Sequence, residues 1–424
     1  MSPTIGDRFA FDIAAAIADT LLKRMLDIKI KDYKAGSTVV IQNASNPGLF
    51  YIVRKGTLAI DTEHRLSDKV LSRFEAGDSF GLVSALTGHH FLVTIYAATD
   101  AQVAEIPVSM IGSYLKAQPD LALKMLRLYS RELRTIQLHL SKLDNPEDRN
   151  ISPEVLMALV QKYIDWQKPH YAARALKAYI EWAEKNNGAH LSTAQNLWPQ
   201  VKDAYQHVDF APRGTAVSAD TMLFSEGEMG RDIFVVLAGS VKMMRIVRGE
   251  EFIIDVLGAG ELFGEMAFIE NAPRMGSAIT TKDSTLIRIT PEQLVSSVAE
   301  GVLQKIFENM ARRIWFSHQR LIIFKITDPL VRMYAYLYNL VRNQNLRTKD
   351  KTGQDRAYKF DITLNELKIL CGIMRLKDTT EANLRTNTNF IFTDDSITVK
   401  SRKKLEDQIA YYRAKSGQII AETQ

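Results

Sequence analysis

An acid and an arginine stand nine residues apart in the segment FGEMAFIENAPRMGSA, which runs from Phe263 to Ala278. A guanidinium fork can clamp a phosphate group with two parallel hydrogen bonds, which makes Arg274 a candidate anion ligand. Gly264 allows the backbone to approach such an anion closely. The amides of Met266 and Ala267 would open a short helix whose N-terminus also favours negative charge. The segment therefore predicts a phosphate-binding loop.

Another copy of this region, which lies earlier in the chain, lacks the charged pair. Residues 36–107 align with residues 219–290 at a constant offset of 183, without an insertion or deletion. The glycines coincide, as Gly56 with Gly239, Gly77 with Gly260 and Phe80-Gly81 with Phe263-Gly264. The first copy has Leu82 in place of the acid and Phe91 in place of the arginine. An anion there would be desolvated without a partner, so we expect a non-binding scaffold, with an unrelated ligand as the alternative.

Composition limits the class of protein. A chain of 424 residues with 46% apolar residues predicts roughly three domains with buried cores. Charged residues interrupt the stretch Phe9–Leu26, which predicts an amphipathic helix rather than a signal peptide, and no apolar run is long enough to span a bilayer. The single cysteine, Cys371, fits a reducing compartment. We expect a cytoplasmic protein without a membrane partner.

The positive charge is concentrated at the C-terminal end. The net charge is +5, and residues 325–424 hold 18 Lys and Arg against 12 Asp and Glu, whereas the rest of the chain is nearly balanced. A basic terminal domain on a neutral body predicts a surface that faces a polyanion. The alternative is a solvated basic face.

Each copy reads as a run of short strands followed by a helix. Glycine-punctuated β-branched and aromatic runs predict an antiparallel roll or sandwich, with helices at Ala122–Leu143 and Val302–Phe324. Between the copies, Ser152-Pro153-Glu154 begins a segment with two amphipathic helices around Lys168-Pro169. This hairpin loosely resembles one tetratricopeptide-type unit, and a structural spacer is the favoured interpretation because such units need neighbours.

The last hundred residues change pattern again. The sequence predicts a helix at Leu330–Leu340, a polar loop at Arg347–Tyr358, a short strand at Lys359–Thr363 and a helix at Leu364–Leu370. Phe390–Phe392 and Ser396–Val399 flank Asp394-Asp395 as a β-hairpin. Helices followed by a small hairpin are the layout of a winged helix. We therefore predict an α+β multidomain chain: a β-roll with flanking helices (residues 1–145), a helical linker (146–210), a second β-roll with a long helix (211–326) and a winged-helix-like domain (327–424).

The binding loop resembles the phosphate-binding cassette of the cyclic-nucleotide-binding family, through Phe263-Gly264-Glu265 and Pro273-Arg274. The resemblance implies that Glu265 accepts a ribose 2′-hydroxyl and that Arg274 is the main anion ligand. It places the Met275 amide and the Ser277 hydroxyl nearby. Family members that prefer guanine tend to carry a hydroxyl residue where this chain has Met275, so cyclic AMP is favoured over cyclic GMP. No metal is expected.

The resemblance continues into the catabolite activator protein family. Residues 308–338 resemble its long helix and hinge, where Ser317 and His318 fall at the adenine-capping positions and Arg313 falls beside them. The spacing of apolar residues in this helix also makes Ser317 the one polar group in its seam. Residues 361–373 resemble the first helix of a helix-turn-helix with Gly372 at the turn, and DDSITV resembles the wing. This implies a transcription regulator that binds DNA as a homodimer.

The recognition helix departs from the family pattern. In residues 374–387, Asp378 and Glu381 fall at positions expected to be buried, so either the register differs or the helix no longer reads DNA. Candidate phosphate contacts remain at Arg375, Lys377, Arg385, Lys400, Arg402, Lys403 and Lys404. A protein that regulates partners without DNA is the alternative function. The sequence contains no His or Cys cluster with metal-ligand spacing, no nucleophile elbow and no Walker loop, so no motif indicates an enzyme.

Overall fold

The computed structural model describes residues 28–61, 73–117, 119–142, 151–247, 249–290, 300–348, 354–373 and 375–416. The helix expected at Phe9–Leu26 lies outside these ranges. The chain forms two compact units: one contains residues 1–128 and 298–312, and the other contains residues 129–297 and 313–424. Among the helices that the structure describes, none is long and apolar enough to cross a membrane.

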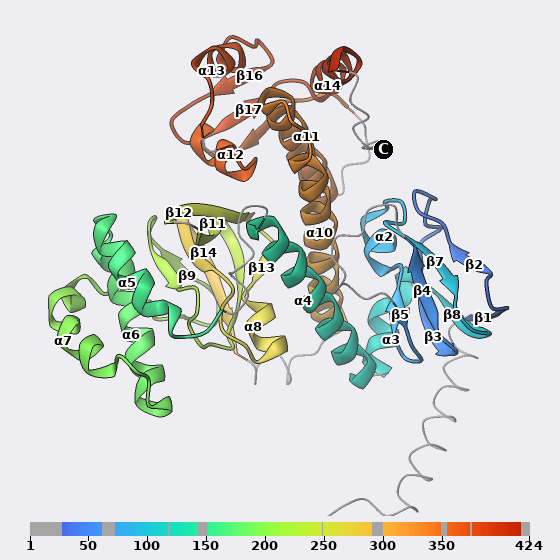
Figure 1. Ribbon diagram of the computed structural model, residues 1–424, viewed down its shortest axis with the longest axis horizontal. Helices are drawn as coiled ribbons and strands as arrows, with labels where there is room; N and C mark the ends of the chain where they lie inside the picture. Colours follow the sequence, from blue (N-terminus) through green and yellow to red (C-terminus); the bar gives the residue numbers. More distant parts are fainter. Residues whose placement is uncertain are drawn as a thin grey trace, which may run out of the picture. The chain divides into compact units, whose positions relative to one another are not determined.

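The first roll consists of two four-stranded antiparallel sheets (Figure 1). One sheet has the order β1 (Lys29–Tyr33), β8 (Ala101–Pro107), β3 (Leu49–Lys55) and β6 (Ser79–Phe80). The other has the order β2 (Thr38–Val40), β7 (Thr94–Ala97), β4 (Leu58–Asp61) and β5 (Arg73–Phe74). Buried aromatic rings fill the space between them, where Tyr51 stacks on Phe80. The helices of this half are α2 (Leu82–Thr87), the 3₁₀ turn η1 (Val108–Met110), α3 (Ile111–Ala117) and α4 (Pro119–Lys142).

The second roll forms one continuous sheet because two of its strands are long. These are β11 (Ile233–Val247) and β14 (Ser277–Ile289), whose pairing shifts register three times between Val236 and Val241. Such bulges bend the strands from one face of the roll to the other. The remaining strands are β9 (Thr215–Val217), β10 (Met222–Phe224), β12 (Glu250–Gly258) and β13 (Leu262–Phe263). The helices are α8 (Glu265–Glu270) and α10 (Glu300–Phe324).

The gapless repeat is visible in the backbone. Helices α2 and α8 begin at the equivalent positions Leu82 and Glu265 and have the same length. Each follows a glycine in the left-handed region, with φ 77° at Gly81 and φ 85° at Gly264. The two copies therefore share the backbone of the binding loop and differ in the side chains that it carries.

Helices between the rolls pack against the second one (Figure 1). The helical hairpin consists of α5 (Val155–Asp165) and α6 (Pro169–Asn186), as the sequence predicts. A further helix, α7 (Leu191–Val201), and the 3₁₀ turn η2 (Lys202–Ala204) were not expected. Buried residues of the hairpin share one core with Met222, Met244 and Ile279 of the second roll. The hairpin is therefore part of the second roll's structure.

The C-terminal segment combines helices with a small sheet. Its elements are α11 (Pro329–Thr348), β15 (Tyr358–Phe360), α12 (Leu364–Leu370), α13 (Asp378–Arg385), β16 (Phe390–Phe392), β17 (Ile397–Val399) and α14 (Arg402–Ser416). The strands form an antiparallel sheet in the order β15-β17-β16. A reciprocal capping box between Thr363 and Glu366 fixes the start of α12.

One expectation for this segment needs correction, and one helix was not expected. Helix α11 extends beyond the expected Leu330–Leu340 to Thr348, so the polar loop expected from Arg347 begins later. Val341 is buried in the core of the segment, which supports the extra turns. Helix α14, which contains the KSRKK run's last residues, was not predicted; its Leu405 and Ile409 are buried in the same core.

We predict that the repeated glycine Gly239 cannot be replaced by alanine without a large loss of stability. Its φ is 91°, and a Cβ would lie 2.2 Å from the Ser284 hydroxyl oxygen. Gly260 has a similar φ of 83° but open space around it, which makes it a matched control. We expect Gly260→Ala to cost about 1 kcal/mol, from backbone strain alone, and Gly239→Ala to cost about 3 kcal/mol or more in denaturant unfolding. Equal costs would contradict the close approach at Gly239.

Candidate functional site

Arg274 is a buried cation without an ion pair among the residues that the structure describes. Its side chain is 3% exposed, Nη1 donates to the Gly264 carbonyl at 2.7 Å and Nη2 donates to the Asp232 carbonyl at 2.8 Å. The guanidinium lies 4.3 Å from the centre of the Phe224 ring, and Nε has no hydrogen-bond partner. Burial lowers the pKa of Arg274 to about 10. The group therefore has donors left for an anion that would also neutralise it.

Gly264 is required at its position for two reasons. Its φ of 85° favours glycine, and a Cβ there would lie 2.7 Å from Arg274 Nη1. A side chain at this position would therefore displace the guanidinium. The glycine thus sets both the start of α8 and the place of Arg274.

Glu265 forms a buried ion pair with the long helix. Its Oε1 accepts from Nη1 of Arg313 at 2.6 Å, and the two side chains are 1% and 6% exposed. Arg313 Nε also lies 3.4 Å from a carboxylate oxygen of Asp255. Burial by itself lowers the pKa of Arg313, but the charges of Glu265 and Asp255 outweigh burial and leave it raised. The second oxygen of Glu265, Oε2, has no hydrogen-bond partner in the part of the chain that the structure describes and can accept from a ligand.

These groups line one partly open pocket of the second roll, whose empty space of about 360 Å³ includes open solvent. The lining combines apolar side chains with four polar ones, Glu265, Arg274, Arg313 and Gln137. Within the described ranges, no group of three His, Cys, Asp or Glu side chains is arranged to hold a metal ion.

The expected ligand residues are distributed unevenly around this pocket. Gly264, Glu265, Met266, Ala267, Arg274 and Met275 line it. The hydroxyl of Ser277 lies elsewhere: it bonds the Tyr163 hydroxyl at 3.0 Å and accepts from the Glu226 amide at 2.9 Å. Ser317 and His318, one turn beyond Arg313 on α10, are half-buried and are not among the lining residues. Gln137 was not predicted, because nothing in its sequence surroundings links residue 137 to a loop more than a hundred residues away.

The helical hairpin contacts the loop that carries Arg274 through Glu228. Arg174 of α6 forms an ion pair with Glu228, and the Glu228 carbonyl accepts from the Arg274 amide at 2.9 Å. Glu228 also accepts from the Ser225 amide through its side chain, at 3.0 Å. A single residue, Glu228, thus connects the hairpin with the backbone of Arg274, through its carboxylate on one side and its carbonyl on the other.

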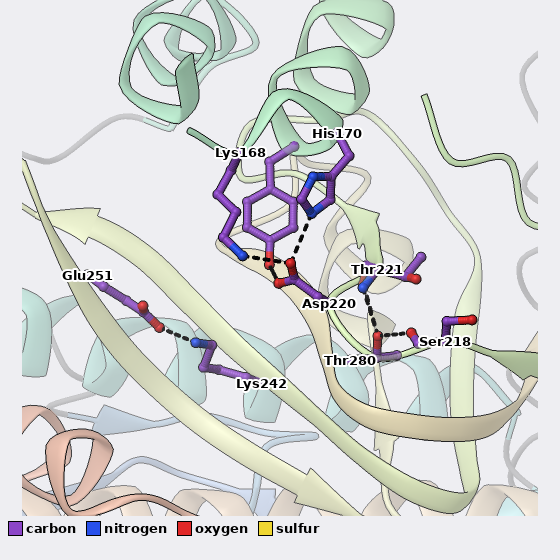
Figure 2. Close-up of polar contacts among 9 residues, drawn as sticks. Lys168, His170, Ser218, Asp220, Thr221, Lys242, Glu251 and Thr280 are labelled. Atoms are coloured by element: carbon purple, nitrogen blue, oxygen red, sulfur yellow. Dashed lines mark hydrogen bonds and ion pairs between the residues drawn. The ribbon is translucent and has the colours of Figure 1, made fainter. Parts of the chain in front are cut away.

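A second contact holds the hairpin to the turn between β9 and β10. Figure 2 shows Lys168 and His170 pointing toward Asp220, whose φ of 61° is unusual for a residue with a side chain. Lys168 Nζ donates to Asp220 at 2.6 Å, and the Tyr171 hydroxyl donates to its other oxygen. The turn of the hairpin and the first half of α6 therefore make polar contacts with the second roll at two places.

The first roll carries an apolar version of the same loop. Leu82 and Phe91, which replace the acid and the arginine, are 1% and 7% exposed. Phe91 belongs to the aromatic core with Tyr51 and lies 6.2 Å from its ring centre. The positions that bear charge in the second copy are therefore filled by the hydrophobic core in the first.

The C-terminal basic candidates lie mostly on the surface. Arg375, Lys377, Arg385, Lys400, Lys403 and Lys404 are exposed, and Arg402 is half-buried beside Glu406. Asp378, which the resemblance places at a position that the family buries, is exposed in the first turn of α13. Glu381 is half-buried and pairs with Lys368 and Arg385, while Leu384 is the buried residue of the helix. The acids lie in the first turn of the helix, where negative charge is stabilising.

The family described as Cyclic nucleotide-binding domain matches the chain twice, over residues 30–118 and 215–300. The chain is 28% identical over 173 residues to the CRP-like cAMP-activated global transcriptional regulator of Mycobacterium tuberculosis, an alignment that covers 40% of this chain and 72% of the regulator. It is 26% identical over 156 residues to the Cyclic AMP receptor protein of Thermus thermophilus, covering 36% of this chain and 67% of that protein.

A longer alignment reaches a protein of another kind. The chain is 26% identical over 320 residues to the cAMP-dependent protein kinase regulatory subunit of Mycosarcoma maydis. This alignment covers 72% of the chain and 51% of that subunit. All three names refer to cyclic AMP, and they describe regulators of two different types.

We predict that Arg313→Met destabilises the protein strongly, because it leaves the Glu265 carboxylate buried without its cation. The expected loss is about 3 to 5 kcal/mol in the free energy of unfolding, measured by denaturant titration without nucleotide. Glu265→Gln in the Arg313→Met background removes the unpaired charge and should recover most of this loss. A double variant as unstable as Arg313→Met would contradict the ion pair.

Proposed function

We propose that this chain, which contains the cyclic-nucleotide-binding domain twice, binds a cyclic nucleotide in its second roll and acts as a ligand-responsive transcription regulator. Cyclic AMP is the favoured nucleotide. The observation that carries the proposal is the buried Arg274 guanidinium, which has no ion pair within the described residues and faces a pocket shared with Glu265. The proposal assigns the chain no catalytic step.

The ligand chemistry matches the unpartnered atoms of the pocket. A cyclic phosphodiester carries one negative charge, which the remaining donors of Arg274 can bind. The Oε2 atom of Glu265 is available for a ribose hydroxyl. The first turn of α8 begins at this point and supplies the positive end of a helix. The Met275 amide completes this set, and Ser317 and His318 are proposed to cap the base from α10.

Transmission from the pocket is proposed to run through Arg320. Ile254 lines the pocket, and its carbonyl accepts from Arg320 Nη1 at 2.7 Å. Arg320 also donates to the carbonyls of Ile253, at 2.8 Å, and of Leu370 at the end of α12, at 2.8 Å. Its side chain is 3% exposed. One buried guanidinium therefore joins the pocket wall to the end of α12 in the C-terminal segment.

The C-terminal segment is proposed to be a winged helix that binds DNA. Helices α12 and α13 are separated by a turn at Gly372, whose φ is 65°, and the hairpin β16–β17 follows them. The exposed cations on and around α13 and α14 would contact phosphates, which gives affinity without sequence information. A single winged helix reads a palindromic site only when two chains pair, so the proposal includes a homodimer.

A second candidate function is regulation of a protein partner without DNA. The alignment with the kinase regulatory subunit covers 72% of the chain, against 40% for the transcriptional regulator. Acidic Asp378 at the start of α13 also disfavours contact with phosphates. Filter binding with random DNA fragments separates the two candidates: binding that weakens as salt increases supports the first, and its absence supports the second.

We predict that Arg274→Ala weakens cyclic AMP binding by about 3 kcal/mol, or roughly 100-fold, because the main anion ligand is lost. Isothermal titration calorimetry measures the change. Arg274→Lys keeps the charge without the fork and should be intermediate. Arg213→Ala, which removes an exposed arginine before β9, is the control and should bind as the wild type does. Unchanged binding by Arg274→Ala would refute the proposed site.

We also predict that Arg320→Leu separates nucleotide binding from its effect on DNA binding. Nucleotide affinity should stay within about twofold of the wild type, while the nucleotide-dependent change in DNA affinity, typically about 5- to 150-fold in coupled systems, should fall toward one. Lys282→Ala is the control, because it removes only a surface ion pair with Asp361 between the same two parts. Full coupling in Arg320→Leu would exclude this route.

A further inference from the structure

Gln137 on α4 brings a buried amide nitrogen to the pocket. The residue is 3% exposed, its Nε2 has no hydrogen-bond partner among the described residues, and it lines the pocket together with Glu265 and Arg274. Helix α4 follows the first roll in the sequence. Its residues from 129 onward nevertheless belong to the same compact unit as the second roll.

Polar contacts fix the position of this helix against the binding loop. The Ser130 hydroxyl donates to Glu270 Oε1 at 2.9 Å, and Arg134 Nε lies 2.6 Å from Glu270 Oε2. Glu270 ends α8, the helix that begins with Glu265. Gln137 follows Arg134 by nearly one helical turn, about 4.5 Å along the axis. The placement of Gln137 in the pocket is therefore set by an ion pair at the other end of α8.

An amide in this place is unfavourable unless a ligand bonds to it. A buried donor without a partner costs about 1 to 3 kcal/mol, which an apolar residue of similar size would avoid. The other polar lining groups are charged: Arg274 and Arg313 donate, and Glu265 accepts. These charged groups suit the phosphate and the ribose hydroxyl of a cyclic nucleotide. The part of the nucleotide left without a partner is its neutral base, whose edge offers both donors and acceptors, as a glutamine amide does.

We propose that Gln137 hydrogen-bonds the purine edge of the nucleotide in the second roll and thereby contributes to base specificity. This inference rests on the proposed function. It assigns a role to the half of the chain whose own loop has no charge: the helix that follows the first roll completes the site of the second. Adenine fits this contact, because a glutamine can accept from its 6-amino group and donate to N7.

The test compares cyclic AMP with a ligand that has no base, methyl riboside 3′,5′-cyclic monophosphate, by direct or displacement calorimetry. Gln137→Leu should weaken cyclic AMP by about tenfold and leave the baseless ligand within about twofold. The melting temperature of the unliganded protein should not fall, because the substitution removes an unpartnered amide. Arg131→Leu, at an exposed position of the same helix, should change neither affinity.

The outcomes separate this inference from the function on which it rests. Equal weakening of both ligands, or none, overturns the purine contact while the cyclic-nucleotide site stands. A fall in melting temperature without a change in relative affinity also overturns it, because Gln137 would then be a structural residue. Wild-type protein that binds neither ligand overturns the proposed function, and the purine contact with it.

Discussion

The second roll is organised around one buried guanidinium whose charge is not balanced by an ion pair in the described parts of the chain. Arg274 is held by the carbonyls of Gly264 and Asp232 and by the face of Phe224. Carbonyl dipoles and an aromatic face stabilise a cation less than a carboxylate does. The folded protein therefore contains a buried positive charge that an anionic ligand can neutralise. Two neighbouring features keep the guanidinium in this place: the glycine at 264 and the contact of Arg174 with Glu228, whose carbonyl bonds the Arg274 amide.

The two copies show how one backbone can serve as a site or as a core. The left-handed glycine and the six-residue helix are the same in both. In the first copy, Leu82 is buried and Phe91 shares one core with Tyr51 and Phe80, so apolar burial stabilises the loop. In the second copy, the equivalent residues are charged, and the loop needs contacts from α6, α10 and α4 instead. The charged loop of the second copy thus lacks the apolar packing that stabilises the first, and helices around the roll supply polar contacts in its place.

The sequence predicted the local pieces of this structure well and their long-range contacts poorly. The constant offset of 183 predicted two equivalent loops, and the turn glycines and strand runs predicted the rolls, because these signals are local in the chain. The sequence did not predict the ion pair of Glu265 with Arg313: the resemblance placed Arg313 beside the residues that cap the base, without naming its partner. Ser277 was expected at the ligand, but strand β14 turns its hydroxyl toward Tyr163 of the hairpin. Gln137 had no local signal, since its role depends on how α4 packs against a loop distant in sequence.

Helix α10 provides a physical reason for coupling in the second unit. Arg313 and Arg320 lie seven residues apart, two turns of the helix and about 10.5 Å along one face. The first pairs with Glu265 inside the pocket, and the second bonds the pocket strand β12 and the end of α12. Neither guanidinium is solvated enough to exchange its partners for water at low cost. In the proposed function, a nucleotide bonds Oε2 of the same carboxylate whose Oε1 holds Arg313, and α10 would connect a change at Arg313 with Arg320. Such differential contact is what a ligand needs in order to shift an equilibrium between two positions of the C-terminal segment.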